Sequence, residues 1–167
     1  MDETLEFLAR TLLVGAGATA VMDAWTLFIK RCFGTVPLDY AMVGRWIGHL
    51  PRGRFVHQAI ARAAPVRGER AIGWGAHYAI GIAFAAMLLA IAGLEWARRP
   101  TVALPLVFGV LTVAAPFFVL QPALGAGIAA SRTPRPGAAR LRSLMTHASF
   151  GLGLALSAWL QSLVLRA

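Results

Sequence analysis

Three ionisable side chains, Asp23, His77 and His147, lie well inside stretches of sequence that are otherwise almost entirely apolar. Asp23 interrupts residues 5–29, a run long enough to cross a bilayer. A charged side chain at the centre of a membrane helix costs at least ~2.5–3.5 kcal/mol, so such residues usually face the protein interior and mark a functional path. A carboxylate and two imidazoles can exchange protons near neutral pH or hold a metal ion. These three residues are therefore the first candidates for a binding site.

The spacing of small and polar residues places Asp23 on one face of its helix. Gly15, Thr19, Asp23, Thr26 and Lys30 follow one another at intervals of four, four, three and four residues. That spacing is a single stripe along an α-helix. Small residues on such a stripe favour close contact between membrane helices. We therefore expect the stripe to face a helix bundle, with Thr19 beside Asp23 in the site.

Each of the two histidines shares a helical face with glycine. His77 is flanked by Gly73 and Gly81, and His147 shares its face with Gly151. At 1.5 Å per residue, Asp23 lies roughly 10 Å inside its helix end, and both histidines lie within about that distance of theirs. Groups at one depth on the inner faces of a small bundle come within contact range. The sequence therefore predicts a polar pocket formed by Asp23, His77 and His147.

A third apolar stretch is interrupted by proline. Pro105, Pro116 and Pro122 occur there, with Gln121 beside the last. Proline removes a backbone donor and breaks a helix, and transporters use broken membrane helices to bind substrates. Gln121 is therefore a further candidate ligand. The alternative is that these prolines are ordinary, because proline is frequent in membrane helices.

The composition indicates which elements position these residues. The chain has 167 residues, 58% hydrophobic and 14% charged, whereas soluble domains carry about 25% charged residues. Residues 71–94, 100–131 and 143–165 contain no formal charge, and each run exceeds the ~18–20 residues that span a bilayer as a helix. We expect an all-α polytopic membrane protein, a four-transmembrane-helix bundle in one domain, with spans near residues 5–30, 71–94, 101–123 and 143–165.

The basic residues predict the topology. Twelve of the 16 Lys and Arg residues fall in or beside loops 31–70 and 132–142. The positive-inside rule places these loops in the cytoplasm and both termini on the opposite side of the membrane. The net charge of +9 then belongs to loops that contact anionic lipid headgroups and not to a nucleic-acid surface.

The first loop carries two predicted short helices at the membrane surface. Residues 38–50 include Tyr40 and Trp46, which suit the headgroup layer. Residues 54–64 place Arg54 and Arg62 on one helical face and apolar residues on another, which predicts an amphipathic helix. The alternative is that this loop gates the pocket or recruits substrate.

Four segments resemble one family: GATAVMDAW (17–25), VGRWIGHLPRGRF (43–55), RGERAIGWGAHYAIG (67–81) and a stretch over 121–154 that begins QPALGAGIAASRTPRP. The family is a bacterial group of small four-span inner-membrane proteins, catalogued as a domain of unknown function. The resemblance covers most of the chain and implies a four-helix membrane fold. It implies no activity and no catalytic residue.

Three classes of function remain open. The first is transport or binding of a small molecule or ion, with Asp23 and His77 as a proton-exchanging pair. The second is a metal or haem site formed by His77, His147 and Asp23. The third is an accessory or assembly subunit of a larger membrane complex, docked through small-residue stripes; a homo-oligomer is the alternative assembly. An enzyme is disfavoured because the chain has no nucleophile elbow, phosphate loop or zinc-protease motif. The residues do not indicate a substrate or a cofactor.

Overall fold

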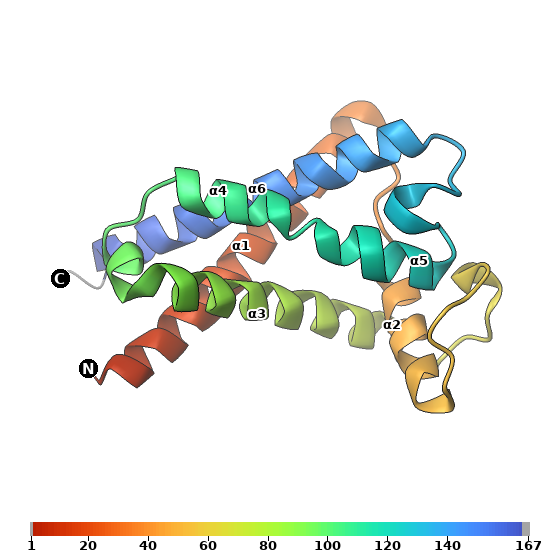
Figure 1. Cartoon of the computed structure of the whole chain (residues 1–167), viewed down its shortest axis with the longest axis horizontal. Helices are drawn as coiled ribbons and strands as arrows, with labels where there is room; N and C mark the ends of the chain where they lie inside the picture. Colours follow the sequence, from red (N-terminus) through yellow and green to blue (C-terminus); the bar gives the residue numbers. More distant parts are fainter. Residues whose placement is uncertain (1, 165–167) are drawn as a thin grey trace. The chain divides into compact units, whose positions relative to one another are not determined.

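The computed structural model describes residues 2–164, and this part of the chain is helical, without strands (Figure 1). The predicted all-α class is confirmed. The α-helices are α1 (Glu3–Phe33), α2 (Tyr40–His49), α3 (Glu69–Arg98), α4 (Ala103–Leu111), α5 (Gln121–Leu124) and α6 (Pro136–Val164).

Within the described residues, three segments are long and apolar enough to cross a membrane: Glu3–Phe33, Glu69–Arg98 and Ala103–Leu124. They contain the spans predicted at residues 5–30 and 71–94 and nearly all of the one predicted at 101–123. The predicted fourth span, 143–165, falls within α6 except for residue 165, which lies outside the described residues. This helix is not among the three, because several polar side chains, including His147 and Gln161, lower its mean hydropathy. The four-span bundle thus stays a prediction.

The ends of α1 follow from its sequence, and a glycine interrupts α3. Helix α1 carries Glu3 and Glu6 in its first turn and Lys30 in its last, charges that complement the helix dipole. Gly34 ends it in the left-handed conformation and donates its backbone N–H to the carbonyl of Lys30. Gly93 has φ 78° and ψ 163° and interrupts α3, one residue before the predicted end of the second span.

The helix of the third candidate span, Ala103–Leu124, is interrupted, as its prolines predict. Helix α4 ends at Leu111, a π-helical segment follows at Pro116–Leu120, and α5 ends at Gly125 with φ 97°. Pro116 begins the π-helical segment, and proline cannot supply a backbone donor there. Wider helical turns of this kind occur frequently at functional sites.

The first loop corrects one prediction. Helix α2 confirms the helix expected at residues 38–50, but residues 54–64 are not an amphipathic helix. They contain only a 3-10 turn, Ile60–Arg62. Their backbone groups pair elsewhere: the N–H of His57 donates to Ala123 O at 2.9 Å, and the Arg45 guanidinium donates to the carbonyl of Ala61 at 3.2 Å. The segment has helical spacing over eleven residues, but it does not form a helix because its backbone groups bond to residues distant in the sequence.

The chain forms two compact units. Unit 1 comprises Met1–Val36, Tyr78–Thr112 and Met145–Ala167, and unit 2 comprises Pro37–His77 and Val113–Leu144. Apolar side chains from α1, α3 and α6 form the core of unit 1, including Val14, Leu88, Phe150 and Leu154. Phe84 extends it through ring contacts with Phe108 and Phe150.

Glycines let the helices of unit 1 approach closely. A Cβ at Gly15 of α1 would lie 2.5 Å from the Cα of Ile82 on α3, and one at Gly153 of α6 would lie 2.8 Å from the Cα of Ala18 on α1. Gly109 of α4 likewise meets Gly151 of α6 backbone to backbone. Such small-residue contacts are typical of helix packing in membranes. These contacts join α1, α3, α4 and α6 within unit 1.

Unit 2 uses the same device between α2 and the start of α3. A Cβ at Gly44 would overlap the carbonyl group of Glu69, and a Cβ at Gly73 would overlap that of Tyr40. The backbones of α2 and α3 therefore touch directly. Across this contact, Tyr40 pairs with His77 and Arg45 pairs with Glu69.

Candidate functional site

Asp23 is held by a tyrosine from another helix of unit 1. The Tyr78 hydroxyl of α3 donates to Asp23 Oδ2 at 3.1 Å. Both side chains are half-buried. Both lie on helices apolar enough to cross a membrane. A hydrogen bond to the charged form of a carboxyl group offsets part of the cost of removing it from water. The pair thus links two candidate spans through a titratable group.

Thr19 lies one turn from Asp23 and is 1% exposed. Its hydroxyl donates to the carbonyl of Gly15 at 2.8 Å, and a Cβ at Gly81 would overlap that hydroxyl oxygen. Thr19 therefore fills the contact between α1 and α3. The predicted inward face of the stripe is confirmed for Gly15 and Thr19, which are buried, whereas Lys30 at its end is exposed.

His147 of α6 is held by α4 within the same unit. Thr112 Oγ1 lies 2.8 Å from His147 Nδ1 and donates to the carbonyl of Gly109 at 2.5 Å. A hydroxyl has one hydrogen, so the His147 Nδ1 must donate to Thr112. This chain of hydrogen bonds fixes the tautomer of His147 and joins α6 to the last turn of α4.

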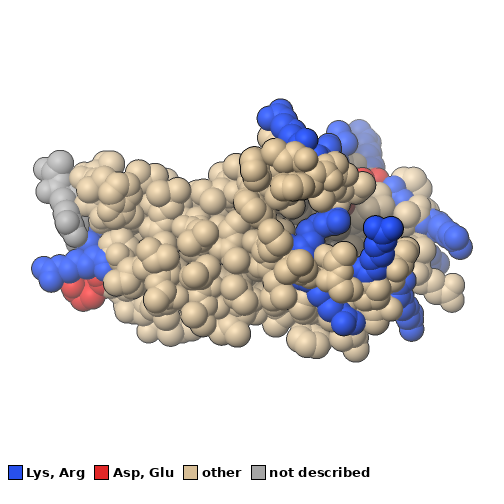
Figure 2. Space-filling model, turned by 90° about the horizontal axis from the view of Figure 1, so that it is seen from above, with Lys and Arg blue, Asp and Glu red and all other residues tan. Residues whose placement is uncertain are grey.

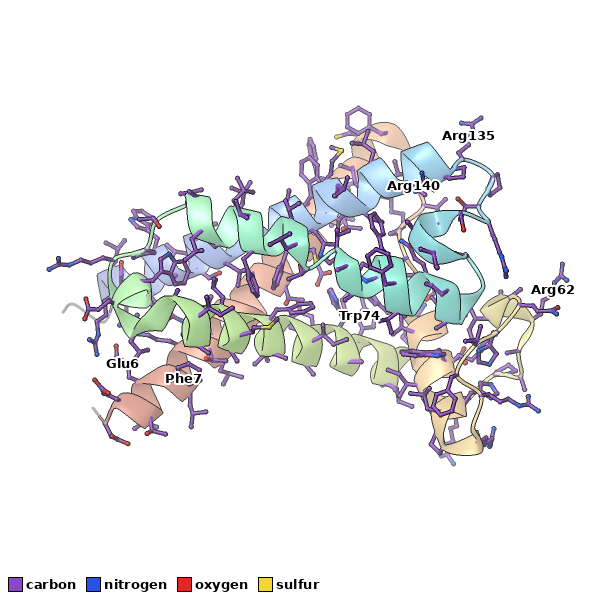
Figure 3. All side chains as sticks on the ribbon, in the orientation of Figure 1. Glu6, Phe7, Arg62, Trp74, Arg135 and Arg140 are labelled. Carbon is purple, nitrogen blue, oxygen red and sulfur yellow. The ribbon has the colours of Figure 1, made fainter. Side chains whose placement is uncertain are left out.

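His77 belongs to unit 2, where aromatic rings surround it. Its Nε2 lies 3.0 Å from the Tyr40 hydroxyl, and the two rings stack with centroids 4.2 Å apart. Trp74, which Figure 3 labels on α3, meets His77 edge-on at 5.8 Å. Trp and Tyr are enriched at membrane–water interfaces. The cluster therefore has the composition of an interfacial anchor around a histidine.

Gln121 also lies in unit 2, at the start of α5. Its Nε2 donates to Ser143 Oγ at 3.3 Å. Its Oε1 is buried and has no hydrogen-bond partner within residues 2–164. An acceptor in this state at the break of a candidate span is suited to bind a donor group.

The five predicted residues thus have partners in two different units. Asp23, Thr19 and His147 lie in unit 1, and His77 and Gln121 lie in unit 2. Across the described chain, no group of three or more His, Cys, Asp or Glu side chains is placed to hold a metal ion. The predicted pocket and haem ligation by two histidines stay predictions.

Sequence reasoning missed the two tyrosines that hold these residues, Tyr40 and Tyr78. Tyr78 could have been noticed, because it follows His77 directly inside an apolar span. Tyr40 lies 37 residues from its partner, and nothing in the local pattern connects them. Contacts between helices therefore determine how these polar side chains pair, and the local sequence does not indicate the pairing.

An arginine also organises unit 2. The Arg45 guanidinium donates to both carboxylate oxygens of Glu69, at 2.7 and 2.8 Å, and to the carbonyls of Ala61 and Ala63. The hydrogen bond to Glu69 raises the pKa of Arg45 above its already high value. Such bidentate pairing suits the planar guanidinium group. Arg45 therefore ties α2, the first loop and the start of α3 together.

A second charged cluster lies in unit 1, at the start of α1, where Figure 3 labels Glu6. Glu6 accepts from Arg10 Nε at 2.8 Å and from Arg98 at 2.7 Å, and Arg10 also donates to the carbonyl of Ala97 at 3.1 Å. Arg10 is 5% exposed. The two arginines are thus paired to one carboxylate, a structural arrangement that joins the ends of two candidate spans.

Basic side chains gather on part of the surface (Figure 2). Unit 2 contributes the exposed arginines Arg52, Arg54, Arg62, Arg67, Arg70, Arg132, Arg135, Arg140 and Arg142. Such clusters beside membrane helices attract anionic lipid.

Comparison with known proteins gives a family but no function. No curated protein and no solved structure matches the chain. One family, described as "Protein of unknown function (DUF2938)", matches residues 12–161. The match covers all five candidate residues, all of unit 2 and most of unit 1, and the chain belongs to this family.

Proposed function

We propose that this protein is a four-span bacterial inner-membrane protein that moves protons across the membrane, alone or with a small solute, and that Asp23 takes up and releases the proton. The observation that carries the proposal is the hydrogen bond from Tyr78 to Asp23 between two helices apolar enough to cross a membrane. Ionisable groups within spans are expensive to keep and typically belong to ion or proton paths.

The chemistry of the pair supports reversible proton exchange. The Tyr78 hydroxyl stabilises charged Asp23 by donation, and it can turn to accept a hydrogen bond when the carboxyl group is protonated. Both side chains are only half-buried within the unit, so the carboxyl group is not sealed in the core. Asp23 can therefore exist in either protonation state without leaving its partner.

Helix α6 is proposed as the fourth span. Its polar side chains Ser149, Ser157, Gln161 and Ser162 are buried, whereas Leu152, Leu156, Trp159, Leu160 and Leu163 are exposed. A helix that hides its polar face and exposes its apolar face is suited to lipid. With four spans, the arginine-rich loops 31–70 and 132–142 lie on one side, the cytoplasm by the positive-inside rule, and both termini lie in the periplasm.

The proposal is tested in liposomes of phosphatidylethanolamine and phosphatidylglycerol that enclose a pH-sensitive dye. A potassium gradient with valinomycin imposes a negative interior, and the dye reports proton entry. We expect the native protein to acidify the interior faster than protein-free liposomes. Asp23→Asn should lower the rate to the protein-free value, because the amide cannot exchange a proton, and Tyr78→Phe should lower it in part.

Glu3→Gln is the matched control, because it removes an exposed acid from the first turn of the same helix. It should retain the native rate. Equal rates for the native protein and Asp23→Asn would contradict the proposal, as would a native rate no greater than that of protein-free liposomes.

A further inference from the structure

Two histidines outside the candidate site lie side by side in unit 2. His49 is the last residue of α2, and His57 lies in the extended part of the first loop. Their ring centroids are 5.2 Å apart, with the planes at 62°. His49 is 1% exposed. The pair is therefore an enclosed feature of the loop and not a solvated one.

The hydrogen bonding of His49 fixes where its lone pair lies. Its Nε2 is 3.0 Å from the carbonyl oxygen of Ala64. A carbonyl only accepts, so Nε2 carries the hydrogen and Nδ1 carries the lone pair in the neutral ring. That Nδ1 is buried and has no hydrogen-bond partner among residues 2–164. Histidines that bind metals typically donate their other ring N–H to a carbonyl in this way.

His57 presents a second nitrogen of the same kind. Both of its ring nitrogens are buried, and neither has a hydrogen-bond partner in the described part of the chain. A neutral imidazole always has one nitrogen with a lone pair. The backbone holds the residue in place: its N–H donates to Ala123 O at 2.9 Å, and a Cβ at Gly125 would lie 2.8 Å from its carbonyl oxygen.

Three buried ring nitrogens without partners are costly, since each unsatisfied polar atom costs about 1–3 kcal/mol. We propose that His49 and His57 together bind a divalent transition metal ion, with zinc, copper or nickel as the chemical class. Imidazole nitrogen suits these ions. With metal–nitrogen bonds of about 2.0–2.1 Å in tetrahedral geometry, two imidazole centres on one ion lie about 5 Å apart, which matches the observed pair.

The site supplies two protein ligands. Water, a backbone carbonyl or a bound solute fills the remaining positions, so binding is weaker than at closed four-ligand sites. This metal site does not include Asp23, and it does not depend on proton movement. The zinc would clamp the end of α2 to the loop that crosses the end of α5.

The test uses the full chain purified in detergent, stripped with a chelator and dialysed against zinc. Bound zinc is then measured by elemental analysis. We expect one zinc per chain, lost in His57→Phe and in His57→Gln. The controls His77→Phe and His147→Phe should keep the bound zinc, because those rings lie in other contacts. Circular dichroism verifies that each variant is folded.

A second readout is the thermal unfolding temperature. Zinc should raise it in the native protein, because a ligand that binds the folded state stabilises that state, and should leave it unchanged in His57→Gln. Native protein that binds no zinc would overturn the proposal. So would zinc that stays bound in both His57 variants, or zinc that is lost in His77→Phe or His147→Phe while the His57 variants retain it.

Discussion

The contact between α1 and α3 depends on Gly15 having no side chain. A Cβ at this position would lie 2.5 Å from the Cα of Ile82 and 3.0 Å from its N, whereas carbon atoms pack best at about 3.5–4.0 Å. The obstacle is backbone, so Gly15→Ala must move the two helices apart by about 1 Å. The same movement would stretch the hydrogen bond from Tyr78 to Asp23, two turns along.

The magnitude follows from a matched substitution. A Cβ at Gly75, on the exposed side of α3, meets nothing within 4 Å. Replacing glycine by alanine within a helix stabilises it by roughly 0.5–1 kcal/mol, and this gain applies equally to Gly15→Ala and Gly75→Ala. Forcing a methyl group into a packed contact costs about 1–3 kcal/mol. The difference in unfolding free energy between the two variants should therefore be about 1–3 kcal/mol.

Unfolding in detergent micelles, followed by circular dichroism against a denaturant, measures this difference. We expect Gly75→Ala to equal or exceed the native stability and Gly15→Ala to fall below it. If Gly15→Ala is as stable as Gly75→Ala, the close crossing of α1 and α3 is refuted.

Three other substitutions test separate features. Ala129→Gly should raise the unfolding free energy by about 1 kcal/mol, because Ala129 has φ 47° and ψ 46°, a left-handed conformation that strains a residue with a Cβ; a decrease in the same unfolding assay would argue against that backbone. Arg45→Lys should speed amide hydrogen exchange in the first loop, since lysine cannot hold both Glu69 and the loop carbonyls; exposed Arg54→Lys is the control, and equal exchange in both variants would speak against the role of Arg45. Glu6→Gln should lower the unfolding temperature more than exposed Glu3→Gln, because it leaves buried Arg10 without its carboxylate; similar temperatures for the two would count against the buried cluster.

Much of the architecture could be predicted from the sequence because it depends on local composition. Uncharged runs located the helices, and the prolines located the break after α4. Gly93 could not be identified as a kink, because nothing in its neighbours requires the left-handed conformation that it adopts. The prediction of an amphipathic helix at residues 54–64 was wrong for a related reason. The residues have helical spacing, but their backbone is held by hydrogen bonds to Arg45 and Ala123.

In the candidate site, too, local sequence identifies some features and tertiary contacts determine the others. Asp23 could be identified as a candidate from the sequence, because a charged side chain within an apolar membrane helix is costly. Its partner Tyr78 comes from α3, 55 residues away, and the glycines that bring the helices together are what set this pairing. The contact between the rings of His49 and His57 likewise depends on the fold of the loop. Side-chain chemistry is thus visible in sequence, whereas pairing is set by tertiary contacts.

The central claim is that Asp23 changes protonation state within the membrane. The most direct measurement is an infrared pH titration of the protein in lipid, compared with the same titration of Asp23→Asn. The difference should contain one carboxyl band that titrates reversibly, and Tyr78→Phe should shift that band by removing its hydrogen bond. A difference spectrum without a titrating carboxyl band would show that Asp23 keeps a single protonation state, and would contradict the proposed proton path.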